Sequence, residues 1–226
     1  MKLGYIRDEL IENSGIVRRI YGLKLLLLTG INDESKWFLL DRERLKYKTK
    51  FMDYGLVLDF GAYKGNFTSK LSKRNPHMSF QVYEPVSNFY DECVRRFKNK
   101  ENIEVFQFGV TSDGRDLDLI VDGPRTKVGN STEKQVFSTK SIVDIFADLN
   151  KVELVKMNIE GMEYECLYTL IRSGYIKKVN YLLIQFHNFR AQDTGDYRNL
   201  IEMLDKDFKS IFQYPWKWEL WKLKTP

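Results

Sequence analysis

The chain has 226 residues, a length that suits one α/β domain with its own core and is short for two. Hydrophobic residues make up 43% and charged residues 30%, which is typical of a globular protein and excludes a disordered or membrane-embedded one. The net charge of +5 favours anionic partners only weakly, because the basic residues are spread along the chain.

Cysteine usage and hydropathy indicate the cellular setting. Cys93 and Cys166 are far apart and show neither a disulfide framework nor a zinc spacing, so we expect two packing residues and a cytoplasmic protein. The longest apolar run, residues 25–28, is far shorter than the roughly 20 residues that a membrane span needs. Residues 16–28 mix basic and apolar side chains, and we expect this helix to pack on its own domain, with peripheral membrane contact as the alternative.

The first 50 residues are expected to form a mainly helical extension. Apolar residues recur there at helical spacing from Val17 to Leu27, and Gly30 suits the end of that helix. No linker rich in proline, glycine or serine marks a boundary. We therefore predict two regions, 1–50 and 51–226, from the change of pattern alone.

From residue 55 onward, apolar runs of strand length alternate with helical patterns. The expected strands are 56–60, 78–83, 103–108, 117–121, 154–159 and 181–186, and the expected helices are 66–73, 87–97, 141–149, 163–173 and 197–205. Residues 122–132 are polar and contain glycine, which predicts a loop. Residues 208–214 and 218–223 indicate an antiparallel pair that turns at Pro215. This order predicts an α/β fold with a doubly wound, mostly parallel sheet.

One stretch, from Val57 to Phe67, combines a buried strand, an acid, a small-residue turn and the start of a helix. The glycines of such a turn let a ligand approach the backbone, and the helix N-terminus offers free N–H groups. Glu84 lies 25 residues after Asp59, where an acid can accept hydrogen bonds from both hydroxyls of a ribose. The missing G-x-G-x-x-G pattern disfavours a nicotinamide-dependent oxidoreductase.

Ligands of such sheets bind beyond the carboxyl ends of the strands, so polar residues at those ends define the candidate site. The residues expected to bind a cofactor are Asp59, Phe60, Gly61, Ala62, Gly65, Glu84, Pro85, Gln107, Phe108 and Asn158. The titratable residues at the later strand ends are Glu160 and His187.

Four stretches make this chain resemble the FkbM family of class I methyltransferases, which use S-adenosyl-L-methionine (AdoMet). They are residues 57–65, 82–85, 154–163 and 184–187, and the clearest reads Lys-x-Asn-x-Glu-Gly-x-Glu from Lys156. The resemblance covers roughly residues 50–190. It implies a Rossmann-like, seven-stranded sheet, AdoMet as cofactor, and O-methyl transfer to a sugar, a glycan or another small hydroxylated acceptor.

The chain departs from the family pattern at three positions. Tyr63 stands where the family often has asparagine, Asn158 where it has aspartate, and Gln185 where an acid is frequent. Two carboxylates are thus replaced by amides, which weakens any proposal of a divalent metal because hard cations favour carboxylates. We therefore predict no metal.

Methyl transfer to an alcohol benefits from a general base, since the alcohol must lose its proton. We expect His187 or Glu160 to be that base, with a slight preference for His187 because its ordinary pKa lies near neutrality. Lys156 completes the expected catalytic set, and its alternative role is a buried ion pair with Glu163 or Glu160 that holds the loop. Glu163 itself is expected to be a solvated or capping charge.

Two rival functions remain at this point. An AdoMet-binding protein of the same fold with little activity is supported by the amides Asn158 and Gln185. A nucleic-acid methyltransferase would use the aromatic segment around Trp216 and Trp218 for stacking, but the same alternation fits an edge strand with one apolar face. The stretch after the fourth strand lacks the Asn/Asp-Pro-Pro-aromatic pattern of amino-methylating enzymes, so no nucleic-acid partner is expected.

Overall fold

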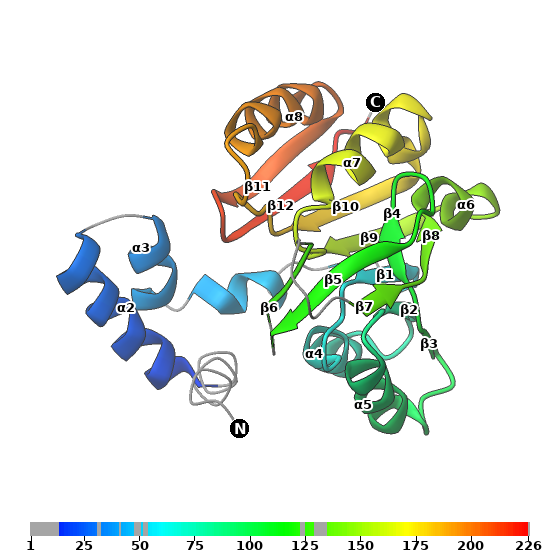
Figure 1. Cartoon of the computed structure of the whole chain (residues 1–226), viewed down its shortest axis with the longest axis horizontal. Coiled ribbons are helices and arrows are strands. Elements are labelled where there is room, and N and C mark those ends of the chain that lie inside the picture. The colour runs from blue at the N-terminus through cyan, green and yellow to red at the C-terminus, as the bar shows by residue number, and fades with distance from the viewer. Residues whose placement is uncertain are drawn as a thin grey trace.

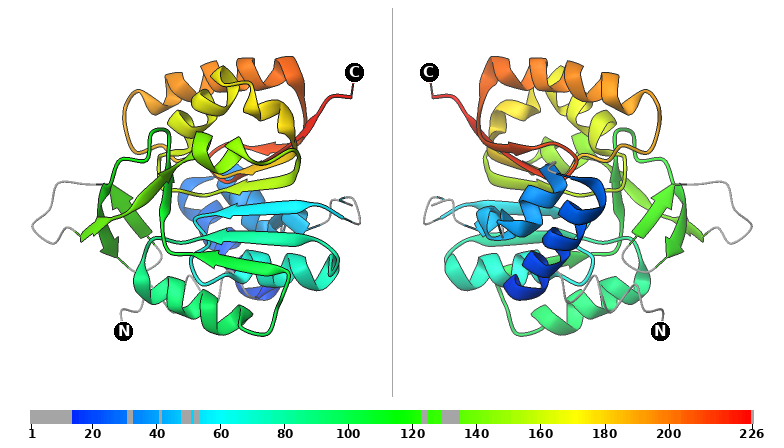
Figure 2. Two further views of the ribbon diagram at one scale, coloured as in Figure 1. Left: turned by 90° about the vertical axis from the view of Figure 1, so that its right-hand side faces the viewer. Right: turned by 90° about the vertical axis from the view of Figure 1, so that its left-hand side faces the viewer.

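The computed structural model describes residues 14–30, 33–40, 42–47, 51, 54–122, 125–128 and 135–225. A seven-stranded sheet forms the centre, and helices cover both of its faces (Figures 1 and 2). The expected α/β class and the doubly wound, mostly parallel sheet are confirmed. Cys93 and Cys166 are both free and buried, as expected of packing residues.

The central sheet has the order β11-β12-β10-β9-β1-β2-β3. Its strands are β1 (Leu56–Phe60), β2 (Ser79–Tyr83), β3 (Ile103–Phe106), β9 (Val152–Met157), β10 (Val179–Ile184), β11 (Phe208–Tyr214) and β12 (Trp218–Leu223). The strand β12 runs antiparallel to both of its neighbours, β10 and β11, and the other neighbouring strands of this sheet pair in parallel. The expectation that Trp218 belongs to an edge strand is wrong, because β12 lies between β10 and β11 and the edge is β11.

Helices divide between the two faces and bury separate apolar clusters. One face carries α4 (Asn66–Arg74) and α5 (Ser87–Phe97), and the other carries α6 (Ile142–Ala147), α7 (Glu163–Arg172) and α8 (Asp193–Asp207). A short 3₁₀ turn, η2 (Tyr175–Lys178), precedes β10. The strand order reverses between β1 and β9, so the ends of these two strands flank the crevice where ligands of such sheets bind.

Two small sheets follow β3. The strands β4 (Gly109–Thr111) and β8 (Thr139–Ser141) pair in parallel, while β5 (Leu117–Asp122) lies between β6 (Arg125–Val128) and β7 (Gln135–Phe137). The loop expected over residues 122–132 is therefore wrong in part, because backbone pairing with β5 makes residues 125–128 a strand despite their polar composition. Residues 123–124 and 129–132 of that segment lie outside the described residues.

The N-terminal region is helical where the structure describes it. It contains α2 (Gly15–Thr29), α3 (Asp33–Leu39) and the 3₁₀ helix η1 (Arg42–Tyr47). Gly30 ends α2 as expected, with a φ of 73° and an N–H that donates to the Leu26 carbonyl. Residues 1–13, 31–32, 41 and 48–50 lie outside the described residues, and a boundary at residue 50 stays a prediction.

The N-terminal helices pack against the C-terminal hairpin. The Trp37 ring of α3 is buried with its centroid 5.2 Å from that of Tyr214, and Lys217 forms an ion pair with Glu34. The helix α2 in turn lies on α3, and its Gly22 has no room for a side chain because a Cβ there would stand 2.3 Å from the Leu39 nitrogen. Packing of α2 on its own domain is thus confirmed for one face of this helix.

A buried ion pair joins the two strands at the crevice. Asp59 of β1 and Lys156 of β9 are register partners, and their side-chain atoms Oδ1 and Nζ lie 3.0 Å apart. The Thr68 hydroxyl of α4 donates to the other oxygen of Asp59 at 2.7 Å, and the Lys156 ammonium donates to the Gly61 carbonyl at 2.6 Å. The prediction that Lys156 pairs with Glu163 or Glu160 is wrong. The parallel register of β1 and β9 places Asp59 beside Lys156 instead.

Removing one member of this pair should destabilise the fold strongly. In Asp59→Ala the Lys156 ammonium stays buried without its counterion, so the free energy of unfolding should fall by about 3–5 kcal/mol in urea denaturation. The single Lys156→Met variant should lose a similar amount. The double variant Asp59→Leu/Lys156→Met should lose clearly less than the sum, because it leaves no charge unpaired. Additive losses in this cycle would show that the two side chains do not depend on each other.

Candidate functional site

The turn after β1 requires glycine at its first position. Gly61 has a φ of 75°, and a Cβ there would stand 2.0 Å from the Asn158 carbonyl oxygen of the neighbouring strand end. The N–H groups of Gly61 and Ala62 both donate to the Tyr83 carbonyl. Gly65, with a φ of 71°, closes the turn and begins α4 against the Phe97 ring. Contacts with Asn158, Tyr83 and Phe97 therefore fix the backbone of this turn in the absence of a ligand.

Tyr63 occupies the most unusual conformation of the turn. Its φ is 54°, a left-handed value at which asparagine is far more frequent than tyrosine. Its ring packs edge-on against Phe89 at 4.4 Å between centroids, and its N–H donates to Glu84 Oε2 at 2.7 Å. The resemblance leads one to expect asparagine here, which adopts this φ more readily. Tyr63 instead places an aromatic ring in the lining of the site.

Glu84 lies at the end of β2, facing the glycine turn. Its second oxygen accepts a hydrogen bond from the Val86 N–H at 3.0 Å. Burial raises the pKa of this carboxyl to about 7, although the hydrogen bonds from Val86 and Tyr63 and the Lys156 charge oppose that shift. The carboxylate therefore stands in a dry site, with lone pairs left for two further donors.

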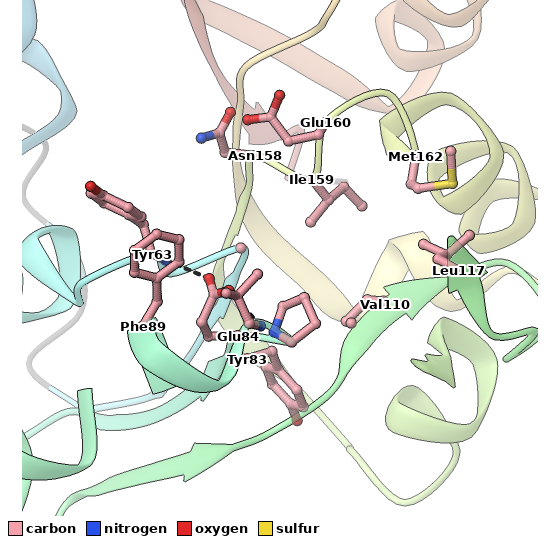
Figure 3. Close-up of a pocket in the computed structure, with 14 residues that line it drawn as sticks. Tyr63, Tyr83, Glu84, Phe89, Val110, Leu117, Asn158, Ile159, Glu160 and Met162 are labelled. Carbon is pink, nitrogen blue, oxygen red and sulfur yellow. Dashed lines mark hydrogen bonds between the residues drawn. The ribbon is translucent and has the colours of Figure 1, made fainter. Parts of the chain in front are cut away.

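These strand ends line a first cavity, which is open to solvent on one side (Figure 3). Figure 3 shows Glu84 below the cavity, Asn158 and Glu160 above it, and apolar side chains on either side. Its lining residues are Gly61, Tyr63, Tyr83, Glu84, Pro85, Val86, Phe89, Gly109, Val110, Leu117, Asn158, Ile159, Glu160 and Met162.

Several residues expected at the cofactor site lie elsewhere. Gln107 and Phe108 are not among the described residues that line the first cavity, and Gly109 and Val110 stand in their place. The strand β3 ends at Phe106, so Gln107 turns outward and donates to the Ser87 hydroxyl, while Phe108 packs on Tyr83. Asp59 and Phe60 are fully buried beneath the turn and support it from below.

A second cavity is also lined by residues of the glycine turn. It shares Gly61, Tyr63 and Asn158 with the first cavity, and it adds side chains of η1, α4 and β12. The full lining is Lys46, Tyr47, Gly61, Ala62, Tyr63, Asn66, Phe67, Lys70, Lys156, Asn158 and Trp218. The buried Oδ1 atom of Asn158 has no hydrogen-bond partner, which marks the border between the cavities as a place for a ligand donor.

The turn after β9 carries a second strained residue. Glu160 has a φ of 54° and lines the first cavity. Glu163 holds this turn, because its two oxygens accept the N–H groups of Ile159 at 2.7 Å and Gly161 at 2.9 Å. Glu163 is fully buried, so the expectation of a solvated charge is wrong, and its carboxylate binds the turn before α7 and does not cap the helix. Backbone strain that is held in place by such bonds is typical of functional sites.

His187 completes a row of three titratable groups. Its Nδ1 lies 2.9 Å from Glu163 Oε1, and its Nε2 lies 3.6 Å from Glu160 Oε2. Burial alone lowers the pKa of His187, but Glu163 and Glu160 outweigh that effect and hold the pKa above its ordinary value of 6.5. His187 lines neither described cavity, so it reaches the first one only through Glu160.

Sequence reasoning missed the apolar part of this site and the role of Glu163. Tyr63 and Phe89 follow strand ends closely and could have been proposed from position alone. Leu117 and Met162 come from elements whose approach depends on the tertiary structure. Among the described residues, no group of three or more histidine, cysteine or acidic side chains could hold a metal ion.

Comparison with known proteins places this geometry in a family. The model of the methyltransferase FkbM domain matches residues 59–212. No curated protein matches the chain. The part of the chain that the structure describes contains no helix long and apolar enough to cross a membrane.

Two solved structures share the fold at low sequence identity. A putative methyltransferase from Streptococcus mutans in complex with SAH has a TM-score of 0.52 and 9% identity, over 82% of this chain and 97% of that chain. A fibrillarin/Nop5p complex has a TM-score of 0.50 and 12% identity, over 79% of this chain and 77% of that chain. These similarities confirm the Rossmann-like methyltransferase fold.

The effect of Glu163 on the pKa of His187 can be measured without knowledge of an acceptor. In Glu163→Gln the carboxylate that raises the pKa of His187 is removed, so that pKa should fall relative to the parent protein. Ring resonances in an NMR titration report it directly, because the chain has only two histidines. His77, which is exposed, gives the second set of ring resonances, from which those of His187 must be assigned separately. An unchanged pKa of His187 would mean that Glu163 acts on the backbone turn alone.

Proposed function

This chain belongs to the FkbM methyltransferase family, and on that premise we propose that it methylates a hydroxyl of a sugar, a glycan or another small hydroxylated acceptor. AdoMet is the cofactor, as membership of this family implies. One observation carries the proposal of O-methylation. A carboxylate, Glu160, faces the first cavity from a strained turn and is backed by the buried pair of His187 and Glu163.

The first cavity has the groups that AdoMet requires. We assign the ribose hydroxyls to Glu84, whose carboxylate stands at the end of β2 with acceptor capacity left over. Gly61 allows close approach at the turn, and the apolar side chains of Phe89, Val110 and Leu117 suit an adenine ring. The unpartnered Oδ1 of Asn158 suits the ammonium group. The Streptococcus mutans neighbour, solved with SAH, is consistent with this assignment.

Bound AdoMet supplies a methyl group on a positively charged sulfonium. In the proposed reaction Glu160 would accept a hydrogen bond from the acceptor hydroxyl and take its proton; the methyl group would pass from sulfur to that oxygen, with the S–CH₃ bond broken and the neutral thioether as leaving group. His187 is assigned as a positioning residue, because its ring lies between Glu160 and Glu163 and outside the cavity lining. Lys156 is likewise assigned to positioning, since its ammonium is bound to Asp59 and to the Gly61 carbonyl.

The acceptor is proposed to enter through the second cavity. Tyr47 and Trp218 supply aromatic side chains there, and Asn66 and Lys70 supply polar groups. A sugar ring has apolar C–H faces and a polar rim, so it suits a cavity with both kinds of group. Asn158 borders both cavities, so an acceptor held in the second cavity would extend its reacting hydroxyl past Asn158 into the first, where Glu160 and the methyl donor lie.

Two observations bear on the rival functions. The amides Asn158 and Gln185, which replace family acids, favour an AdoMet-binding protein with little activity. Trp218 is buried, and the partly buried Trp216 packs on Tyr197, which disfavours their use as a stacking surface for nucleic-acid bases. We therefore keep the binding protein as the second candidate.

AdoMet affinity should depend on the ionisation of Glu84. Only the carboxylate accepts hydrogen bonds from both ribose hydroxyls, so binding should strengthen as the pH rises through about 7. Below that pH the affinity should fall by up to about tenfold per pH unit, because binding must expel a proton. Calorimetric titrations at pH 6, 7 and 8 measure this. In Glu84→Gln the affinity should be lower and nearly independent of pH, and a pH slope that persists there would exclude Glu84 as its source.

Transfer itself should depend on Glu160. In Glu160→Gln the base is lost, and kcat should fall by about 10²–10³-fold while the dissociation constant of AdoMet stays within about twofold. Labelled AdoMet with a panel of methyl glycosides provides the assay, and the same glycosides with every hydroxyl already methylated provide the acceptor control. Glu202→Gln, at an exposed position on α8, is the matched variant and should behave as the parent.

Each alternative outcome has a separate meaning. Label on RNA or on amines, and not on glycosides, would contradict O-methylation of sugars. Tight AdoMet binding without transfer to any hydroxylated acceptor would favour the binding protein.

A further inference from the structure

The helix α2 has apolar side chains on two opposite faces. One face lies on α3, where Gly22 is buried and the Tyr21 ring meets Phe38 at 5.0 Å between centroids. The other face is formed by Ile16, Ile20, Leu23 and Leu27, which we call the outer stripe. These four side chains are 73%, 64%, 50% and 79% exposed.

The outer stripe is continuous along the helix. Its members are four, three and four residues apart, so they lie on one line over the length of α2. Single exposed apolar residues are ordinary on protein surfaces, but an aligned row of large ones marks an interaction surface. Figure 1 shows α2 at the outside of the molecule, beside α3 and away from the central sheet.

Basic residues border this stripe on both sides. With 3.6 residues per turn, Arg19 and Lys24 project at about 70° to either side of its centre. Both side chains are exposed. The helix sequence Gly15–Thr29 contains no acidic residue. The apolar row is therefore framed by positive charge alone.

From this arrangement we propose that α2 docks on the surface of an anionic lipid bilayer. The outer stripe enters the interface between headgroups and acyl chains, and Arg19 and Lys24 reach outward to the phosphates. A helix of 15 residues is about 22 Å long, which is too short to span the hydrocarbon core, so it lies in the plane of the surface.

Charge decides between a bilayer and a second copy of the chain. Two α2 helices that paired through their outer stripes would bring the basic borders together, and the helix has no acid to neutralise them. Phosphate-bearing headgroups supply the missing negative charge over the whole length of the helix. The net charge of +5 acts in the same direction.

Vesicle flotation of the full chain tests the proposal. The protein should float with vesicles of phosphatidylcholine that contain about one third phosphatidylglycerol, and much less with phosphatidylcholine alone. In Leu23→Ser/Leu27→Ser the partition coefficient on the anionic vesicles should fall by about tenfold or more, because two large apolar side chains no longer enter the interface. In Arg19→Gln/Lys24→Gln it should fall toward the value on neutral vesicles.

A matched variant controls for loss of exposed apolar side chains in general. Val136 and Ile211 are 69% and 49% exposed on other elements, and Val136→Ser/Ile211→Ser should float as the parent does. AdoMet affinity should be the same in all of these proteins, which confirms that each is folded. Three outcomes would overturn the proposal: no flotation of the parent, equal flotation of the Leu23→Ser/Leu27→Ser protein, or a dimer in light scattering that this double variant dissociates.

Discussion

The buried pair of Asp59 and Lys156 is the interaction on which the site depends. It joins the two strands that flank the crevice, and through Thr68 it also holds the helix that begins at the glycine turn. The same ammonium binds the Gly61 carbonyl, so a single cation fixes strand spacing and turn together. Neither charge is accessible to solvent, and each therefore needs the other. Asp59 acts on a ligand through the backbone that it supports.

The turn after β9 is also held by a buried acid, Glu163, as the turn after β1 is supported by Asp59. Glu163 binds two N–H groups on either side of Glu160 and one nitrogen of His187, which keeps Glu160 in a left-handed conformation over the cavity. Tyr63 is held in a similar conformation on the opposite turn. Of the three non-glycine residues with positive φ in the described part of the chain, Tyr63 and Glu160 line the first cavity and Trp216 lies in the C-terminal hairpin, so two of the three strained positions are at the candidate site.

The segments outside the family resemblance meet next to the site. Tyr47 comes from the N-terminal region and Trp218 from the C-terminal hairpin, and both line the second cavity with residues of the glycine turn. The packing of Trp37 on Tyr214 holds these two regions together. The residues expected to select the acceptor are therefore separate from those that bind the cofactor, so the acceptor can differ between proteins that share the AdoMet site.

The sequence by itself determined the strand–turn–helix unit at Asp59, the acid at Glu84, the family and the doubly wound sheet, because apolar periodicity and glycine spacing are local properties. The sequence predicts β3 to run to Phe108, whereas the strand ends at Phe106, and Gly109 and Val110 are the residues of this segment that line the first cavity. Only the tertiary structure decided that Lys156 pairs with Asp59, that Glu163 is buried, and that β12 lies inside the sheet. Each of these features depends on strand register and strand order. These bring Lys156 within hydrogen-bonding distance of the Phe60 carbonyl, about 100 positions away, and no local sequence pattern predicts such a contact.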